Sequence, residues 1–224
     1  MAGVTDALAA VHARIEHAAR RAGRSADRVR LLAISKKQPL EKIREAHAAG
    51  QREFGENYAQ ELADKAAALA DLPGLRWHFV GHLQRNKAKL VAPLCELVHT
   101  VDSVELADAL LRRTERPRLR CLVEVNLGEE SQKGGVPPGE VGALCEKLVA
   151  LPRLSLEGLM CLPPLEGEAR GYFRSLRELR DGLQRRLGIP LPELSMGMSD
   201  DFEDAIEEGA TWVRLGTILF GPRG

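Results

Sequence analysis

Short apolar runs alternate along the chain with longer segments whose apolar residues recur every three or four positions. The runs have the length and composition of buried β-strands, whereas the longer segments have the spacing of amphipathic helices. The pattern predicts strands at residues 29–35, 52–55, 75–80, 97–101, 119–125, 154–160, 193–196 and 211–215. It predicts helices at residues 1–22, 39–49, 58–70, 86–94, 103–113, 138–150, 168–187 and 200–208, followed by a short closing segment.

After the first helix, the chain thus repeats a strand followed by a helix eight times. Such alternation requires parallel strands, and eight units can close into a barrel without edges. A doubly wound sheet is disfavoured because no Gly-x-Gly-x-x-Gly turn follows a strand. We therefore expect an α/β fold, a single (β/α)8 TIM-type barrel with an extra N-terminal helix, forming one domain over residues 1–224.

Charge and cysteine content exclude several classes of protein. Lys and Arg number 32, as do Asp and Glu, so the formal net charge is +0 and no field attracts nucleic acid or an anionic membrane. The N-terminal segment lacks the apolar core of a signal peptide, and no later segment is long enough to span a bilayer. The cysteines lack the C-x-x-C spacing of a zinc knuckle and the pattern of a disulfide framework, which suggests a reducing cytoplasm. They are Cys95, Cys121, Cys145 and Cys161.

The first predicted strand ends in Ser35 and Lys36, which places an amine where α/β proteins bind ligands. Partial desolvation at such a position favours the neutral, nucleophilic amine. The alternative is an ordinary surface lysine at the start of a loop, since Lys37 follows directly. The position of Lys36 alone favours a surface lysine, so a functional role depends on residues elsewhere in the chain.

The loops after the last two predicted strands carry groups that bind phosphate, and in a (β/α)8 barrel these loops are common phosphate sites. After the seventh strand, Gly197 permits close backbone approach and Ser199 opens a helix with free N–H groups. After the eighth, Arg214 precedes Gly216 and Thr217, which add backbone donors and a hydroxyl. A plain helix cap and a plain turn are the alternatives. Because both motifs occur on adjacent loops, a phosphate site is as well supported by the sequence as a plain helix cap and a plain turn.

A lysine and a phosphate site at one barrel mouth suggest pyridoxal 5′-phosphate, a cofactor that needs a lysine for its aldehyde and a partner for its pyridine nitrogen. Lys36 shares this mouth because the first strand neighbours the eighth in a closed barrel. Asn57 is placed to hydrogen-bond a ring substituent, or else caps the following helix. Arg214 faces the pyridine nitrogen and keeps it unprotonated, or else forms an ion pair with a carboxylate after the seventh strand. No metal site is expected, because His78 and His82 are not spaced on a helix.

Several blocks of the chain together resemble the pyridoxal phosphate homeostasis protein family, also called the YggS/PROSC family. The signature is WHFVGHLQRNK at residues 77–87, and further blocks lie at residues 31–36, 54–58, 158–160, 194–201 and 213–221. The resemblance implies a barrel of the alanine-racemase type, fold type III, with Lys36 as the Schiff-base lysine. It also places Ser199, Gly216 and Thr217 at the phosphate and Arg214 near the pyridine nitrogen.

By the same resemblance, the chain binds, buffers or delivers the cofactor in intracellular vitamin B6 homeostasis, without an established turnover or catalytic residue. Apo enzymes that depend on the cofactor are the expected partners. The alternative is a single-domain enzyme, an amino-acid racemase or decarboxylase, with His82 or Tyr58 as a second proton carrier. Related enzymes of this fold add a β-domain that dimerises, and this chain is too short for one. We therefore expect a monomeric carrier.

Overall fold

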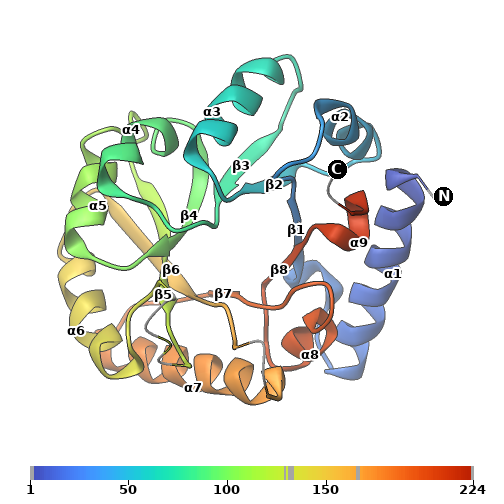
Figure 1. Cartoon of the computed structure of the whole chain (residues 1–224). Coiled ribbons are helices and arrows are strands. Elements are labelled where there is room, and N and C mark those ends of the chain that lie inside the picture. Colours follow the sequence, from blue (N-terminus) through green and yellow to red (C-terminus); the bar gives the residue numbers. More distant parts are fainter. Residues whose placement is uncertain (1–2, 129, 131–133, 165–166, 223–224) are drawn as a thin grey trace.

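The structure of the protein, a computed structural model, describes residues 3–128, 130, 134–164 and 167–222. Within these residues the strands form one closed barrel in which neighbouring strands are parallel (Figure 1). Chain order is also spatial order, and β1 pairs with β8 to close the ring. The predicted (β/α)8 barrel is therefore confirmed. The strands are β1 (Arg30–Ile34), β2 (Glu53–Glu56), β3 (Arg76–Phe79), β4 (Cys95–Val101), β5 (Leu119–Val125), β6 (Leu154–Cys161), β7 (Glu193–Ser195) and β8 (Trp212–Leu215).

Helices surround the barrel (Figure 1). The α-helices are α1 (Val4–Arg21), α2 (Leu40–Ala48), α3 (Ala59–Ala68), α4 (Ala88–Val91), α5 (Val104–Leu111), α6 (Pro138–Val149), α7 (Ala169–Leu187), α8 (Phe202–Glu207) and α9 (Thr217–Phe220). Two short 3-10 helices, η1 (Ala26–Arg28) and η2 (Arg85–Lys87), precede β1 and α4. Residues 1 and 2 of the predicted first helix lie outside the described residues.

Two of the predicted helices are wrong in extent. The helix expected at residues 86–94 is split into η2 and the short α4, and Pro93, which has no N–H to continue a helix, lies two residues after the end of α4. The helix expected from residue 200 begins at Phe202, because the Asp201 carboxylate accepts a hydrogen bond from the Met198 N–H at 2.6 Å and closes a turn first. Ser199 therefore lies in this turn and does not open a helix.

Strand side chains alternate between the barrel interior and the surrounding helices, which gives two apolar cores. The larger core fills the space between the barrel and the helices. The smaller one lies inside the barrel and consists of Leu32, Ile34, Val80, Leu97, Leu122, Met160 and Trp212. Burial of these side chains supplies the main free energy that holds the barrel together.

The N-terminal helix α1 lies outside the ring beside α8, α9 and α2 (Figure 1). Its apolar face is buried, and its polar face is fixed by ion pairs of Arg14 with Glu203 at 2.9 Å and of Arg21 with Glu207 at 2.6 Å. The predicted extra N-terminal helix is therefore present, and it covers the part of the barrel where the first and last strands meet.

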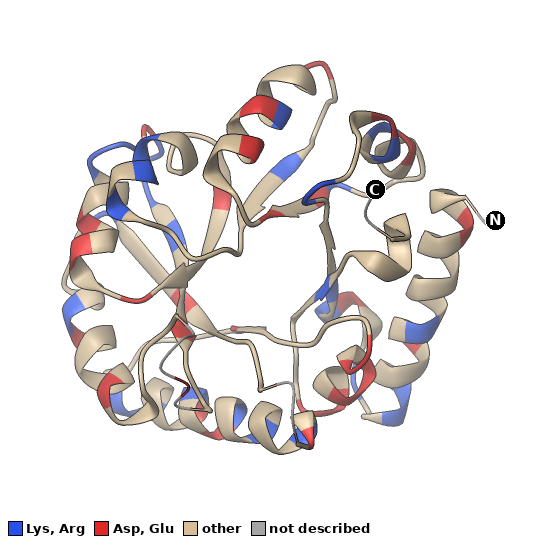
Figure 2. Ribbon diagram, viewed as in Figure 1, with Lys and Arg blue, Asp and Glu red and all other residues tan. Residues whose placement is uncertain are grey.

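Charged residues of both signs are interspersed around the helical ring (Figure 2), in keeping with the net charge of +0. In the described ranges, no helix combines the length and apolar character that crossing a bilayer requires. The cysteines at positions 95, 121, 145 and 161 are all buried free thiols.

Candidate functional site

A tight turn at the end of β1 separates two neighbouring lysines. The N–H of Gln38 donates to the Ser35 carbonyl at 3.0 Å, so Lys36 and Lys37 occupy the middle of the turn. Lys37 adopts a left-handed backbone with φ 57° and is exposed, whereas Lys36 is half-buried and lines a cavity at the C-terminal end of the barrel. The turn thus directs one of two chemically identical side chains into the cavity.

A buried ion pair stabilises this turn. The ammonium group of Lys65, on α3, donates to the Ser35 carbonyl at 2.5 Å and to the carboxylates of Glu56 and Glu61 at 2.8 Å each. The Ser35 hydroxyl also donates to Glu56, at 2.7 Å. Burial raises the pKa of Glu56, while the adjacent Lys65 opposes that rise. Lys65 and Glu56 therefore fix the strand end from which Lys36 projects.

The cavity beside Lys36 has a volume of about 380 Å³, within the size range of small-molecule sites. Its apolar lining comes from the end of β1 and from the segments after β3, β6 and β7. The lining residues are Ile34, Val80, Leu162, Pro163 and Met198. The structure brings together all six residues for which the sequence predicted cofactor contacts. They are Lys36, Asn57, Ser199, Arg214, Gly216 and Thr217.

Arg214 enters this cavity from β8 and is only 4% exposed. Its guanidinium donates to the Ser195 hydroxyl and to the Cys161 carbonyl, at 2.8 Å each. Both of these partners are uncharged, and no ion pair of Arg214 is found among the residues that the structure describes, so the alternative of a structural ion pair is not supported. Burial lowers its pKa, opposed by the more distant Asp201 and Glu124. The cavity therefore contains a positive charge without a directly bonded carboxylate, which favours an anionic ligand.

The loops after β7 and β8 present two hydroxyl groups to the cavity. Gly197 has φ 93°, and a side chain there would lie 2.6 Å from the Ala205 Cβ, so the close packing of this loop requires glycine. Ser199 follows it, and Thr217 begins α9 after Gly216. Both hydroxyl residues also line an outer hollow of about 740 Å³. Ser199 and Thr217 thus lie between the cavity and this outer hollow.

Asn57 carries an unmet hydrogen-bond acceptor. The N-terminal cap of α3 is Tyr58, so the interpretation of Asn57 as the cap is wrong. The buried Oδ1 atom of Asn57 has no partner in the described part of the chain. Gly81 packs against the Asn57 backbone, where any Cβ would lie 2.0 Å from the carbonyl oxygen. This contact holds Asn57 at the cavity with an acceptor available to a ligand.

These groups fit the needs of pyridoxal 5′-phosphate: an amine for an aldehyde, hydroxyls and backbone donors for a phosphate, an arginine, and an unpartnered amide oxygen. A metal site is not formed by the residues that the structure describes, because they contain no group of three or more His, Cys, Asp or Glu side chains suited to one. The arrangement can bind an anionic aldehyde and hold it against a half-buried lysine.

A smaller cavity of about 170 Å³ adjoins the first and shares Asn57, Val80 and Leu162 with it. His82 and Glu124 line it. Glu124 is 7% exposed, and burial, aided by the charge of Asp102 and opposed by Arg214, raises its pKa to about 7. The barrel mouth therefore contains a carboxyl group that titrates near neutral pH.

Sequence reasoning missed Lys65, Glu124, His99 and Ser195. Glu124 and His99 lie on strands whose other residues are mostly apolar, and Ser195 ends the short strand β7. A polar side chain inside such a run was the available signal, because it must find a partner within the barrel. No comparable signal existed for Lys65, which lies on an Ala-rich helix among other charged residues.

Comparison with known families gives one match over nearly the whole chain. Residues 7–224 match the family model of the alanine racemase N-terminal domain. Curated relatives named pyridoxal phosphate homeostasis protein include one from Aquifex aeolicus, 48% identical over 97% of this chain and 97% of the relative. The relative from Homo sapiens is 42% identical over 99% of this chain and 87% of its own length.

Solved structures agree with this match. The PipY protein of Synechococcus elongatus, solved with pyridoxal phosphate bound, is 39% identical, with a TM-score of 0.85 over 97% of this chain and 100% of that chain. The alanine racemase of Corynebacterium glutamicum is 19% identical, with a TM-score of 0.68 over 96% of this chain and 62% of that chain. The second likeness is one of fold alone.

Proposed function

The chain belongs to the alanine racemase N-terminal domain family and to the pyridoxal phosphate homeostasis proteins, and on this basis we propose that it binds pyridoxal 5′-phosphate and takes part in intracellular vitamin B6 homeostasis. It holds the cofactor as a Schiff base with Lys36 and buffers or delivers it. The relative solved with pyridoxal phosphate bound supports this proposal. Residues 1–224 act as one cofactor-binding domain, in a cytoplasmic monomer.

The observation that carries the proposal is the convergence of six residues on one cavity of about 380 Å³. Both the half-buried residue Lys36 and Arg214, whose guanidinium lacks a bonded carboxylate, line this cavity. An amine that is to bond an aldehyde benefits from desolvation, and a buried cation favours a bound anion. Pyridoxal 5′-phosphate satisfies both requirements in a single molecule.

Each residue has a separate task in this proposal. Ser199 and Thr217 donate their hydroxyl groups to the phosphate, and the Gly216 backbone approaches it closely. Asn57 accepts a hydrogen bond or donates one to a ring substituent, and Arg214 faces the pyridine nitrogen. The bound cofactor supplies a reactive aldehyde and an electron-accepting ring. An arginine at the ring nitrogen weakens that electron acceptance, which suits storage of the cofactor better than turnover.

The experiment compares Lys36→Ala with Lys37→Asn after each protein is mixed with pyridoxal 5′-phosphate. Asn tolerates the left-handed backbone at position 37, so the second variant is a matched control. We expect wild type and Lys37→Asn to develop the visible absorption of a Schiff base and Lys36→Ala to lack it. Borohydride reduction and peptide mass spectrometry should then locate the pyridoxyl group on Lys36. A label on another lysine, or equal absorption in Lys36→Ala, would overturn the proposal.

Delivery is distinguished from simple binding by transfer of the cofactor. The loaded protein is mixed with an apo enzyme that depends on pyridoxal phosphate, in the presence of a scavenger for the free cofactor. We expect the apo enzyme to regain activity despite the scavenger. Loss of all transfer at rising scavenger concentration would restrict the protein to buffering.

An amino-acid racemase or decarboxylase is the second candidate function, and Glu124 is the observation that favours it. A carboxyl group with a pKa raised to about 7, in a cavity that adjoins the cavity lined by Lys36, is suited to proton transfer at neutral pH. A screen of single amino acids with the loaded protein tests this candidate. Turnover on the order of 1 per second that is lost in both Lys36→Ala and Glu124→Gln would establish an enzyme.

A further inference from the structure

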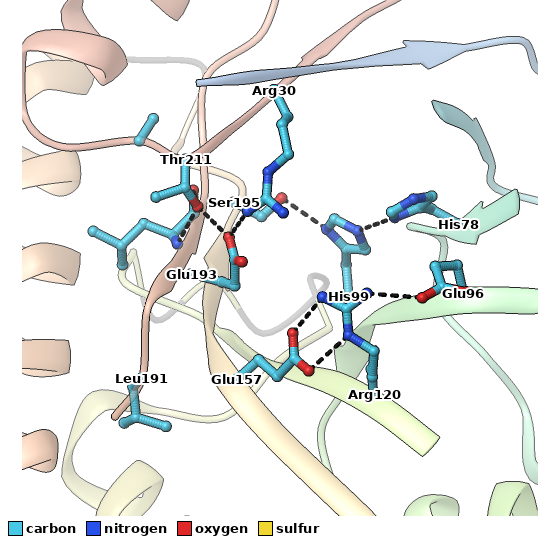
Figure 3. Close-up of polar contacts among 12 residues, drawn as sticks. Arg30, His78, Glu96, His99, Arg120, Glu157, Leu191, Glu193, Ser195 and Thr211 are labelled. Atoms are coloured by element: carbon cyan, nitrogen blue, oxygen red, sulfur yellow. Dashed lines mark hydrogen bonds and ion pairs between the residues drawn. The ribbon is translucent and has the colours of Figure 1, made fainter. Parts of the chain in front are cut away.

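A chain of hydrogen bonds runs through the barrel interior from Arg214 to Glu53 near the start of β2. Arg214 donates to the Ser195 hydroxyl at 2.8 Å, and that oxygen lies 2.9 Å from Nδ1 of His99. Nε2 of His99 lies 3.0 Å from Nδ1 of His78, and Nε2 of His78 lies 2.8 Å from the Glu53 carboxylate. Figure 3 shows the middle of this chain, with the His99 ring between Ser195 and His78.

The two ends of the chain determine the direction of every hydrogen bond in it. Arginine only donates, and an ionised carboxylate only accepts. Burial would raise the pKa of Glu53, but the hydrogen bonds from His78 and Arg76 outweigh it and hold that pKa at about 2. With one proton on each ring, His78 must donate from Nε2 to Glu53 and His99 must donate from Nε2 to His78. The Ser195 hydroxyl must then donate to Nδ1 of His99. All four bonds then have the same polarity.

Both histidines are neutral in this arrangement. Burial lowers the pKa of His78 and lowers that of His99 still further, and the charges of Arg214, Arg30 and Arg120 add to the effect at His99. The two outer arginines are themselves paired, Arg30 with Glu193, and Arg120 with Glu96 and Glu157 (Figure 3). The Trp212 ring packs against both imidazoles, with centroids 4.8 and 6.0 Å away, and the Arg30 guanidinium lies over the Trp212 ring, 4.0 Å from its centroid.

We propose that Ser195, His99 and His78 are positioning residues that connect Arg214 to the distant carboxylate of Glu53 and hold its guanidinium at the cofactor cavity. The proposal rests on the proposed function, in which Arg214 faces the pyridine nitrogen. Hydrogen bonds of one polarity reinforce one another, so the charge of Glu53 makes the Ser195 oxygen a better acceptor. Glu53 thus acts as a remote counter-charge for Arg214, while the cation stays free to contact the ligand.

The simpler interpretation is that these side chains only satisfy one another inside the barrel. That role predicts effects on stability alone. A positioning role predicts in addition that a change at the far end of the chain alters the environment of Arg214 and the affinity for the cofactor. The far end, at Glu53, lies at the opposite end of β2 from the cavity residue Asn57, so it has no direct contact with the ligand site.

The first test needs no cofactor. Nitrogen NMR of the histidine rings in the ligand-free protein reports which ring nitrogen carries the proton. We expect both His78 and His99 to be neutral and protonated at Nε2 between about pH 7 and 8. A proton on Nδ1 of either ring, or a charged ring in this range, would break the direction of the chain and overturn the proposal.

The second test compares Ser195→Ala and Glu53→Gln with His47→Gln as control. His47 is a buried histidine that contacts the Pro73 carbonyl, 2.9 Å away, outside the chain. We expect Ser195→Ala to weaken cofactor binding about tenfold or more, because it removes a charge-assisted hydrogen bond from Arg214. Glu53→Gln keeps an acceptor but removes the charge, so it should shift the Arg214 Nε–H resonance and weaken binding by a smaller factor.

The outcomes separate this proposal from the proposed function. Unchanged affinity and an unchanged Arg214 resonance in Glu53→Gln, with only a loss of stability, would overturn the positioning role. If Ser195→Ala does not fold, the Glu53→Gln result decides, because that residue lies at the rim of the barrel. A wild-type protein that binds no cofactor but shows the expected ring tautomers would refute the proposed function and leave the hydrogen-bonded chain intact.

Discussion

Lowering the pH should unfold this protein more readily because His78 and His99 are buried in their neutral form. On unfolding, each imidazole regains the ordinary pKa of about 6.5 and takes up a proton that the folded state excludes. Because the pKa of each histidine is lower in the folded than in the unfolded state, the contribution of these residues to stability is complete above about pH 6.5. Stability is then lost as the pH falls toward the lowered folded value.

The size of the effect follows from the number of protons taken up. Each histidine costs about 1.4 kcal/mol of unfolding free energy per pH unit once the pH is below about 6.5. From about pH 7.5 to about pH 5.5 the two residues together remove at most about 3 kcal/mol, the limit in which neither ring takes up a proton in the folded state. That loss is a large fraction of the 5–15 kcal/mol, roughly, that stabilises an ordinary domain.

The assay is urea unfolding of wild type and of the double variant His78→Gln/His99→Gln at both pH values. Glutamine keeps a donor and an acceptor but does not titrate, so the variant should lose less unfolding free energy than wild type on acidification. At neutral pH the variant should be less stable than wild type. The raised pKa of Glu124 makes stability increase as the pH falls, but Glu124 is present in both proteins and its effect cancels in the difference. An equal loss of stability in wild type and variant would refute the conclusion that both rings are neutral in the fold.

Three further substitutions test other parts of the site. Lys65→Met should cost about 3–5 kcal/mol of unfolding free energy in urea, because it leaves Glu56 buried without its cation, and adding Glu56→Gln should recover most of this loss. Gly81→Ala should lower the midpoint of thermal unfolding and weaken cofactor binding about tenfold or more. The reason is that the new Cβ would lie 2.0 Å from the Asn57 carbonyl oxygen, and an unchanged midpoint would contradict this packing. Glu124→Gln should stabilise the protein by about 3 kcal/mol near pH 8 and by less than about 1 kcal/mol near pH 5. The sign follows because a pKa raised to about 7 makes wild-type stability fall as the pH rises from about 4.5 through 7, and equal effects at both pH values would contradict it.

The barrel and its mouth could be predicted because they depend on regular features of the sequence. Alternating strands and helices require parallel strands, and the carboxyl ends of parallel strands share one rim. Residues that follow a strand, such as Lys36, Ser199 and Thr217, must therefore meet there, wherever they lie in the chain. Glycine on two of the loops strengthened the prediction.

The features that could not be predicted depend on packing between distant segments. Lys65 is buried only because Glu56 and the Ser35 carbonyl lie opposite it in the fold. The partnership of His99 with Ser195 depends on the relative register of β4 and β7 across the barrel interior, which no local pattern specifies. The predicted start of α8 was wrong because a hydrogen bond to the Asp201 carboxylate closes a turn before the helix begins.

The pairing of β1 with β8 also bears on when the binding site can form during synthesis. Lys36 leaves the first strand of the barrel, whereas Arg214, Gly216 and Thr217 belong to the last strand and the loop after it. Contacts between such distant segments require closure of a loop of nearly the whole chain, and its entropic cost places them late in folding. A nascent chain that has not yet released β8 from the ribosome therefore has no cofactor cavity, and cofactor capture reports completion of the barrel.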